Sequence, residues 1–293
     1  MKSGFVSIIG RPNTGKSTLL NTIINNKIAI VSDVAGTTRN SIHGVYNDSE
    51  TQIVFVDTPG IHKPQDKLGR ELNKEAYSNL SDIDLILFIV DASMGIGKGD
   101  KFIINALKNN DVPVILILNK IDKLNNEEIL NAINSYKDLY DFAEIVPISA
   151  LKNDNVDRLL KVVKTYLNDT VKYYDDGVIT NASKYFLASE FVREKILELT
   201  KDEIPHSVTC VTTNYQEKSN VININVDIIV DRSNLKKIII GKGGKMLKEI
   251  GSRARVDLEN ALGKQIYLEL YVKTIEDWRD KERYLKEFGI IDE

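Results

Sequence analysis

The sequence predicts an α/β fold, a doubly wound mixed sheet, followed by a smaller α+β domain. In the first half, near-continuous apolar runs of strand length alternate with amphipathic helical stretches, a pattern typical of a mostly parallel sheet covered on both faces. Around residues 168–180 this pattern gives way to polar and turn-forming residues. A chain of 293 residues is about twice a typical domain, so we expect two domains, at 1–170 and 183–293, with a linker over 171–182.

The elements of the first domain follow from hydrophobic periodicity. Short apolar runs bounded by turn residues indicate buried strands, and apolar residues three or four apart indicate helices. The expected strands are 5–9, 53–57, 85–90, 113–119 and 144–149, with 43–46 as an added edge strand. The expected helices are 17–24, 69–80, 100–108, 127–139 and 156–167.

The second half has a different order of elements. We expect helices at 183–199 and 245–262, strands at 207–213, 221–230 and 265–272, and a glycine-rich turn at Gly241–Gly244. The run at 238–240 consists of three isoleucines, and β-branched residues favour a strand.

Composition narrows the function classes. Lys and Arg number 39 against 42 Asp and Glu, a net charge of −3, so a nucleic-acid role requires a local basic patch. The single cysteine, Cys210, cannot form an internal disulfide and is expected to be a buried apolar residue of a protein from a reducing compartment. The longest apolar runs have the length of strands, well below the ~20 residues of a membrane helix. We expect a cytoplasmic protein.

Residues 10–17, GRPNTGKS, match the phosphate-loop pattern G-x-x-x-x-G-K-[S/T] between an expected strand and an expected helix. Loop N–H groups and the helix N-terminus can bind phosphates, Lys16 can reach the β- and γ-phosphates, and the Ser17 hydroxyl can bind Mg²⁺. The expected contacts are Gly10, Arg11, Pro12, Asn13, Thr14, Gly15, Lys16, Ser17 and Thr18.

A second motif, Asp57-Thr58-Pro59-Gly60, ends an apolar strand, at the sheet edge where ligands bind in open α/β sheets. Asp57 can hold Mg²⁺ through water, and the Gly60 N–H can meet the γ-phosphate. In the loop at 36–39, Thr38 is expected to bind Mg²⁺ only when the γ-phosphate is present, with Thr37 as the substitute. The expected metal site is Ser17, Thr38 and Asp57.

A third motif, residues 119–122, NKID, predicts guanine. The Asp122 carboxylate can accept from the two N–H donors of guanine, which adenine lacks. Asn119 is expected at the base N7, and the Lys120 stem over the ring. Ser149 and Ala150 follow the next strand, where a backbone N–H can meet guanine O6. An ATP-using kinase, which would prefer adenine, is the weaker alternative.

A basic patch lies in the second domain. Between residues 232 and 255 there are eight basic residues, Arg253 and Arg255 among them, opposed only by Glu249. Such a patch suits a phosphate backbone, although a solvated helix face is the ordinary interpretation of a charge run. The expected RNA contacts are Arg232, Lys236, Lys237, Gly241, Lys242, Gly243, Gly244, Lys245 and Lys248.

Together the nucleotide motifs resemble those of translation-factor-related GTPases. The second half, at 189–195, 204–208, 238–244 and 267–273 and at Trp278, resembles the C-terminal half of the Era family of ribosome-assembly GTPases. The resemblance covers essentially the whole chain. It implies a P-loop GTPase domain followed by a type II KH domain, in which 238–240 is helical and Gly241–Gly244 is the GXXG loop that clamps single-stranded RNA.

The resemblance also implies cofactors and partners. We expect GTP or GDP with Mg²⁺, a monomer, and binding to the 3′ end of small-subunit ribosomal RNA in the assembling small subunit. Peripheral contact with the cytoplasmic face of the cell membrane stays open. In potassium-activated relatives an Asn at the position of Asn13 helps to hold K⁺, so K⁺ is a further candidate cofactor here.

The catalytic group is the least determined part of the site. Ile61 stands where Ras-like GTPases have the Gln that orients the attacking water, so we expect slow intrinsic hydrolysis and assign no catalytic residue. His62 is expected to be a surface residue and is not assigned a catalytic role. Arg39 could approach the phosphates, although a basic residue on such a loop is expected to face solvent. A GTPase signalling module whose second domain binds protein or anionic membrane is the alternative function.

Overall fold

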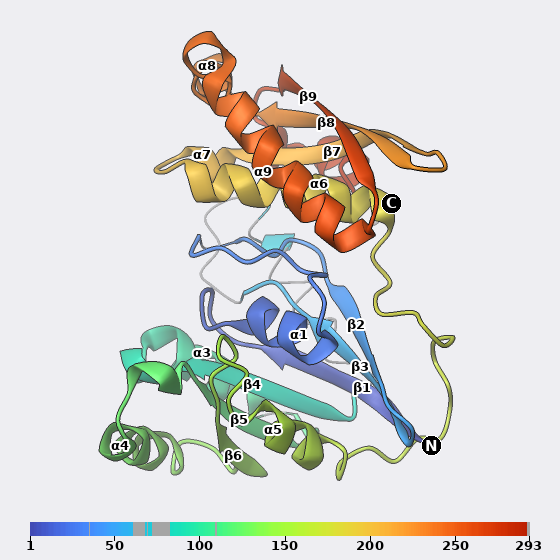
Figure 1. Cartoon of the computed structure of the whole chain (residues 1–293). Coiled ribbons are helices and arrows are strands. Elements are labelled where there is room, and N and C mark those ends of the chain that lie inside the picture. The colour runs from blue at the N-terminus through green and yellow to red at the C-terminus, as the bar shows by residue number, and fades with distance from the viewer. Residues whose placement is uncertain (35, 61–67, 69, 72–82, 109, 292–293) are drawn as a thin grey trace. The chain divides into compact units, whose positions relative to one another are not determined.

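The computed structural model describes residues 1–34, 36–60, 68, 70–71, 83–108 and 110–291 (Figure 1). The described chain divides into two compact units. Among the described residues, the first unit contains 1–29, 38–60, 70–71, 83–108 and 110–181. The second contains Ile30–Thr37, Leu68 and residues 182–291.

A six-stranded mixed sheet forms the first unit. Its strand order is β2-β3-β1-β4-β5-β6, with β2 antiparallel to β3 and the other neighbouring pairs parallel. The mixed α/β sheet predicted from the sequence is confirmed, edge strand included. The strands are β1 Lys2–Ile9, β2 Ile42–Asn47, β3 Thr51–Asp57, β4 Leu85–Asp91, β5 Val114–Asn119 and β6 Glu144–Pro147.

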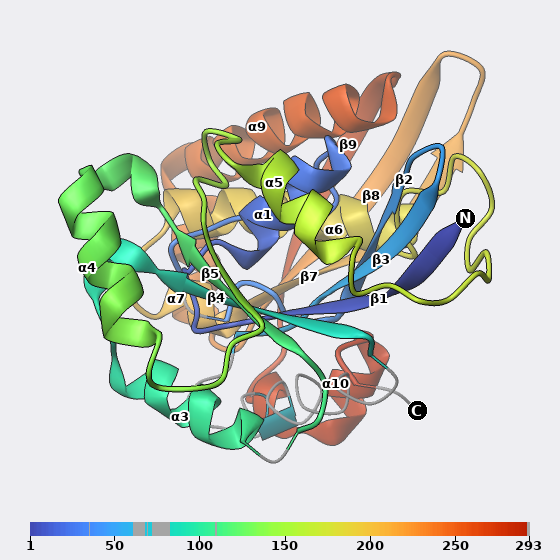
Figure 2. The same ribbon diagram turned by 90° about the horizontal axis from the view of Figure 1, so that it is seen from below.

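Helices cover both faces of this sheet. Side chains of α3 and α4 pack on alternate residues of β4 and β5, and Figure 2 shows α1 and α5 on the opposite face. The helices are α1 Lys16–Ile24, α3 Lys98–Leu107, α4 Asn126–Tyr136 and α5 Val156–Val163. The helix expected at 69–80 lies outside the described residues, apart from residues 70 and 71. Residues 61 and 62 lie outside them as well.

The segment expected as a linker is fastened to the first unit. Gln52 accepts from the N–H groups of Tyr173 and Tyr174 at 2.7 and 2.9 Å. The Val45 N–H donates to Ile179 O, and the His43 N–H donates to the Asn181 side chain, both at 2.9 Å. Chain up to Asn181 therefore runs along β2 and its neighbours.

A three-stranded sheet, β7 Val208–Glu217, β8 Val221–Val230 and β9 Gln265–Thr274, forms the second unit. β7 and β8 are antiparallel, whereas β8 and β9 are parallel. Helices α6 Lys184–Leu199, α8 Ser233–Ile240 and α9 Lys245–Leu262 share its apolar core, and the short helix α7 Ile204–Ser207 precedes β7. The strand that propensity favours at 238–240 is wrong, and the helix that the family resemblance implies is confirmed.

Two single residues complete this core. Cys210 is buried, as expected. Trp278 begins a short 3₁₀ helix, Trp278–Asp280, before α10 Glu282–Glu287. Its indole is buried, and its N–H donates to Ser207 O at 3.2 Å. No helix in the described part of the chain is long and apolar enough to cross a membrane.

Helix α6 is buried along most of its length, charged residues included. Its carboxylate Glu194 accepts from the Val31 N–H at 2.9 Å, and its Arg193 guanidinium donates to Thr37 O. Ile30 joins the apolar core of the same unit. The segment Ile30–Thr37, which follows α1 in sequence, is thus built into the second unit.

Candidate functional site

The phosphate loop connects β1 to α1 and has little room for side chains. Gly15 precedes α1 with φ +99°, and a Cβ there would lie 2.2 Å from Asn119 Nδ2. A Cβ on Gly10 would lie 2.4 Å from the Ile89 carbonyl oxygen. Both positions therefore require glycine, and the chain can turn sharply into the helix N-terminus.

The base motif holds the outer side of this loop. Lys120 Nζ donates to Asn13 O at 2.7 Å, and Asn119 Nδ2 donates to Thr14 O at 2.8 Å. In a planar peptide the C=O and the next N–H point in opposite directions. Carbonyls held from outside therefore turn the following N–H groups toward the inner side, where a phosphate would lie.

Lys16 lies buried at the centre of the loop. Its Nζ donates to Gly10 O at 3.2 Å and to Arg11 O at 2.9 Å. Burial lowers the pKa of this amine to about 8, and the nearby Asp57 carboxylate acts in the opposite direction. A phosphate group bound here would favour the charged amine, because an opposite charge offsets the cost of burial.

The three expected metal-binding side chains converge. Ser17 Oγ donates to Asp57 Oδ2 at 2.7 Å, and Ser17 Oγ lies 3.1 Å from Thr38 Oγ1. Asp57 Oδ1 is buried without a hydrogen-bond partner among the described residues. Burial raises the pKa of Asp57 to about 6, against the effects of Lys16 and Ser17. Two hydroxyls and an unsatisfied carboxylate oxygen fit Mg²⁺, a hard cation that binds oxygen.

The alternative metal ligand, Thr37, is used differently. Its hydroxyl donates to Val34 O at 2.6 Å. The Thr37 hydroxyl is thus engaged with the backbone, and Thr38 stays the predicted metal ligand. Described residues contain no group of three or more His, Cys, Asp or Glu suited to a metal.

The base-recognition residues also lie together, but they are partly engaged with one another. Asp122 Oδ1 accepts from Ser149 Oγ at 2.5 Å, and Asn119 Oδ1 accepts from the Ala150 N–H at 2.9 Å. Asn119 thus links the phosphate loop to Ala150. The expected contacts with guanine N7 and O6 stay predictions. They require the Asn119 amide N–H and the Ala150 N–H, which donate to protein oxygens here, to be shared with a base.

Several expected residues have other partners. Thr58 Oγ1 donates to Ile8 O at 2.9 Å, so its hydroxyl fixes β3 against β1. A Cβ on Gly60 would lie 3.0 Å from Pro12 N, so this glycine sits directly against the phosphate loop. Arg39 is buried, with 5% of its surface exposed, and the expectation of a solvent-facing side chain is wrong.

A second candidate site lies in the second unit. Gly241, Gly243 and Gly244 all have positive φ, between 61° and 75°, which glycine adopts without strain. A Cβ on Gly241 would lie 2.9 Å from Met246 N, whereas Gly243 and Gly244 face open space. The turn can therefore bring a ligand's backbone close to α9.

Next to this turn, a groove of about 450 Å³ runs between α9 and β9. One wall carries cations and small residues of α9, and the other carries apolar side chains of β9. Its lining includes Gly244, Leu247, Lys248, Arg255, Leu268 and Leu270. A groove with cations on one wall and apolar side chains on the other suits a single nucleic-acid strand, whose bases stack while its phosphates meet cations.

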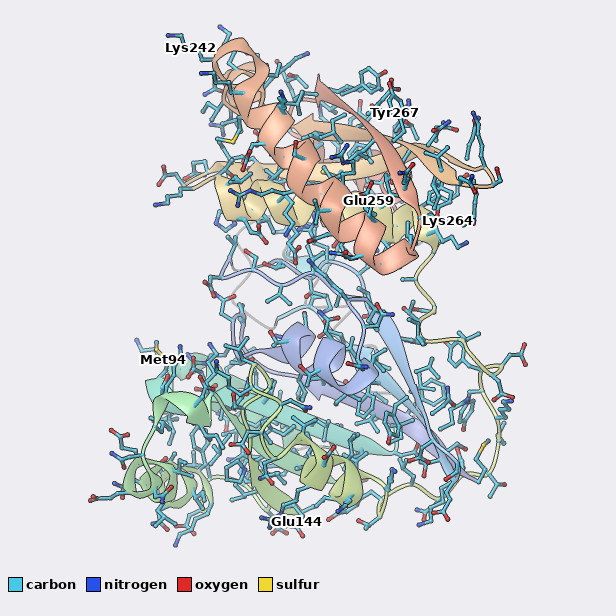
Figure 3. All side chains as sticks on the ribbon, in the orientation of Figure 1. Met94, Glu144, Lys242, Glu259, Lys264 and Tyr267 are labelled. Carbon is cyan, nitrogen blue, oxygen red and sulfur yellow. The ribbon has the colours of Figure 1, made fainter. Side chains whose placement is uncertain are left out.

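Only some expected RNA residues border this groove. Gly244 and Lys248 line it, while Arg232, Lys237, Lys242 and Lys245 are exposed elsewhere on the unit and Lys236 is half-buried. Sequence reasoning missed the contribution of β9, including the exposed Tyr267 (Figure 3). The alternation of polar and apolar residues along β9 was the available signal.

Comparison with known proteins gives matches in both halves. Residues 5–120 match the family model described as 50S ribosome-binding GTPase, and residues 203–279 match the KH domain model. The chain is similar over its whole length to Era in complex with MgGDPNP and nucleotides 1506–1542 of 16S ribosomal RNA, at 43% identity, TM-score 0.96 and full coverage of both chains. The same values hold for a substituted Era from Aquifex aeolicus bound to GDP·AlF₄⁻.

Proposed function

Because the chain belongs to the Era family of GTPases, we propose that it binds the 3′ end of small-subunit ribosomal RNA and assists assembly of the small ribosomal subunit under the control of GTP. The observation that carries the RNA part is the cationic groove beside the GXXG turn. The first unit is a GTPase that uses Mg²⁺.

The GTP half of the proposal assigns roles around the phosphate loop. Lys16 binds the β- and γ-phosphates with the loop N–H groups. Ser17 and Thr38 bind Mg²⁺ directly, and Asp57 binds it through water. Ser17 Oγ lies 2.7 Å from Asp57 Oδ2 and 3.1 Å from Thr38 Oγ1, which supports this assignment. The ion, when bound, neutralises the charge that develops on the phosphates.

Thr38 lies on a loop, so it binds Mg²⁺ only when that loop is held in place. The Gly60 N–H meets the γ-phosphate. GTP therefore orders both segments and GDP releases them. Since Ile61, and not Gln, directly follows Gly60 in the sequence, slow intrinsic hydrolysis is expected.

Two further roles are proposed for side chains at the ends of the nucleotide. Asp122 selects guanine by accepting from its two N–H donors, and its hydrogen bond with Ser149 supports the required orientation. Asn13, held with φ +64°, contributes to a K⁺ site beside the phosphates. Equal hydrolysis rates in KCl and NaCl would rule out the K⁺ role.

The RNA half assigns the groove to an unpaired strand. Bases pack against Leu268 and Leu270, and Lys248 and Arg255 neutralise phosphates, consistent with the lining of the groove. The GXXG turn lies against the sugar–phosphate backbone, because its open glycines leave space there.

A matched pair of glycine variants tests this assignment. Gly243 and Gly263 both have φ near +60° and open space around a Cβ, and they lie at opposite ends of α9. Figure 3 marks the two ends by Lys242 and Lys264. Gly243→Asp is expected to weaken binding of a short single-stranded RNA by about tenfold or more, because it places a carboxylate against phosphates.

Gly263→Asp adds the same charge in a similar backbone conformation and is expected to bind RNA as the wild type does. Filter binding at fixed salt gives both affinities. Equal losses in the two variants, or no loss in either, would refute the assignment of the RNA strand to the turn and favour a protein or membrane ligand for this unit.

For location, we propose the cytoplasm, where a free thiol such as Cys210 stays reduced and small ribosomal subunits are assembled. A monomer is expected. Peripheral membrane contact is a further proposal, and flotation with anionic vesicles tests it.

A further inference from the structure

The side chain of Arg11, a residue of the phosphate loop, lies against the start of α3. Arg11 Nε forms an ion pair with Asp100 Oδ1 at 2.7 Å. A Cβ on Gly97 would lie 2.6 Å from Arg11 Nη1, and a Cβ on Gly99 would lie 2.6 Å from Arg11 Cδ. Two glycines and one carboxylate therefore form a cradle that fits an arginine side chain and has no space for additional atoms.

The carboxylate of this cradle is itself fixed. Asp100 is fully buried, and its Oδ2 accepts from the Gly97 N–H at 2.7 Å and from the Tyr136 hydroxyl at 3.4 Å. Burying an ionised carboxylate is costly unless it is paired and hydrogen-bonded. Asp100 therefore holds the Arg11 guanidinium in one position. If Arg11 is displaced, the fixed carboxylate of Asp100 cannot move with it.

The backbone of the same arginine faces the nucleotide site. Arg11 O accepts from Lys16 Nζ and from Thr14 Oγ1, both at 2.9 Å. The position of this carbonyl sets where the Lys16 amine lies, and the amine in turn must meet the phosphates. A shift of the Arg11 side chain therefore passes directly to the group that binds phosphate.

We propose that Gly97, Gly99 and Asp100 are positioning residues for the nucleotide site, acting through Arg11 to fix the first turn of the phosphate loop. The proposal rests on GTP binding by the first unit and adds residues of α3 to that site. None of the three is expected to touch the nucleotide.

Gly99→Ala separates positioning from folding. The added methyl group enters the space of Arg11 Cδ but leaves Asp100 unchanged, and alanine is a better helix former than glycine. The gain in helix propensity opposes the cost of displacing Arg11 from buried Asp100, so thermal unfolding is recorded for the variant and nucleotide release is measured at a temperature where it is fully folded. The variant is expected to release a fluorescent GDP or GTP analogue about tenfold faster, since a loss of roughly 1.4 kcal/mol from a hydrogen bond made by a charged group corresponds to a factor of ten.

Steady-state hydrolysis adds a second readout. Because Lys16 binds phosphates before and during the reaction, the KM for GTP should rise with a smaller change in kcat. Lys101→Ala, an exposed change on the same helix, is the control and should match the wild type. A residue with only a structural role would leave both the dissociation rate and the KM of Gly99→Ala unchanged, and that result would overturn the proposal.

A double-variant cycle gives an independent test. Arg11→Met fills the cradle without charge, and Asp100→Asn keeps the shape of the carboxylate. If Arg11 and Asp100 act through one contact, the double variant should lose no more GTP affinity than the single variant with the larger loss. Fully additive losses would refute the coupling, and wild-type GTP binding in the same titration keeps that outcome distinct from a failure of the GTPase assignment itself.

Discussion

At the scale of single residues, the nucleotide site depends on oxygens that the protein leaves incompletely satisfied. Asp57 Oδ1 is buried without a partner in the described chain, although buried polar atoms are nearly always hydrogen-bonded. The Ser17 and Thr38 hydroxyls lie beside the other oxygen of this carboxylate or beside each other. A cation at this point would remove the cost of that unsatisfied group.

Neighbouring threonines allow a sharp prediction. Thr38→Ala is expected to weaken affinity for a non-hydrolysable GTP analogue with Mg²⁺ by about tenfold or more, since loss of even a residue that supports a metal ligand typically costs that much. Affinity for GDP should change little. Thr37→Ala removes a hydroxyl that donates to Val34 O and should change neither affinity by as much. Isothermal titration with both nucleotides measures this, and a larger effect from Thr37→Ala would contradict the assignment.

The sequence predicted most of these residues, because the motifs follow strands whose carboxyl ends meet at one sheet edge. It could not predict the Arg11 contact, since the partner Asp100 is 89 residues away and belongs to no motif. Arg39 was misjudged for a similar reason: the burial of a cation on a loop depends on tertiary contacts that no local pattern reports.

At the scale of elements, α6 buries charged residues as well as apolar ones. Glu190, Arg193 and Glu194 are all buried, and Arg193 Nε and Nη2 donate to Glu190 at 2.7 and 2.6 Å. Its charges bind other parts of the second unit, including the segment Ile30–Thr37.

Breaking this pair has a predictable cost. Arg193→Met should lower the free energy of unfolding by about 3 kcal/mol, since removing one member of a buried pair leaves the other charge uncompensated. Arg193→Met combined with Glu190→Leu should recover a large part of that loss. Urea unfolding of Arg193→Met, Glu190→Leu, the double variant and the wild type measures these free energies. A loss in the double variant equal to the sum of the two single losses would contradict the pairing.

The edge strand β2 carries a histidine suited to a pH test. Burial lowers the pKa of His43 from 6.5, and its Nδ1 lies 2.8 Å from the Tyr174 hydroxyl. Below about pH 6.5 the unfolded chain binds a proton more readily than the folded one, so the free energy of unfolding should fall as the pH decreases.

His43→Gln removes this contribution. The difference in unfolding free energy between wild type and variant, measured from about pH 7.5 to pH 5, should shrink or reverse as the pH falls. A constant difference over that range would show that His43 does not titrate differently on folding.

Element types were predicted better than their contacts. The isoleucines at 238–240 favour a strand by propensity, yet Leu235 and Ile239 of α8 lie in the core with a helical spacing of four. Packing against α9 decides between the two conformations, and no local preference contains that information. The fastening of residues 173–181 along β2 was equally invisible, because polar turn-forming residues are typical of free linkers.

At the scale of the whole molecule, the two units share one continuous stretch of chain. Thr37 belongs to the second unit and Thr38, its neighbour in sequence, to the first. Thr38 is the proposed Mg²⁺ ligand, so one peptide bond joins the proposed ligand to a residue whose carbonyl oxygen accepts from Arg193 of α6.

Nucleotide and RNA binding should therefore be thermodynamically linked. We expect RNA affinity to differ between the GDP-bound form and the form with a non-hydrolysable GTP analogue, by about fivefold or more for a typical coupling energy. Linkage requires RNA to change the preference for GTP over GDP by the same factor. Fluorescence anisotropy measures both directions, and identical RNA affinities in the two nucleotide states would show that the units bind independently.

The buried Cys210 has a practical consequence for that question. Since it is the chain's one cysteine and is shielded by the core of the second unit, thiol-reactive dyes should react slowly with the native protein. Cysteines introduced at exposed positions, one in each unit, would then carry a donor and an acceptor selectively. Single-molecule energy transfer could then follow the separation of the units through a catalytic cycle, and Cys210 would not have to be replaced first.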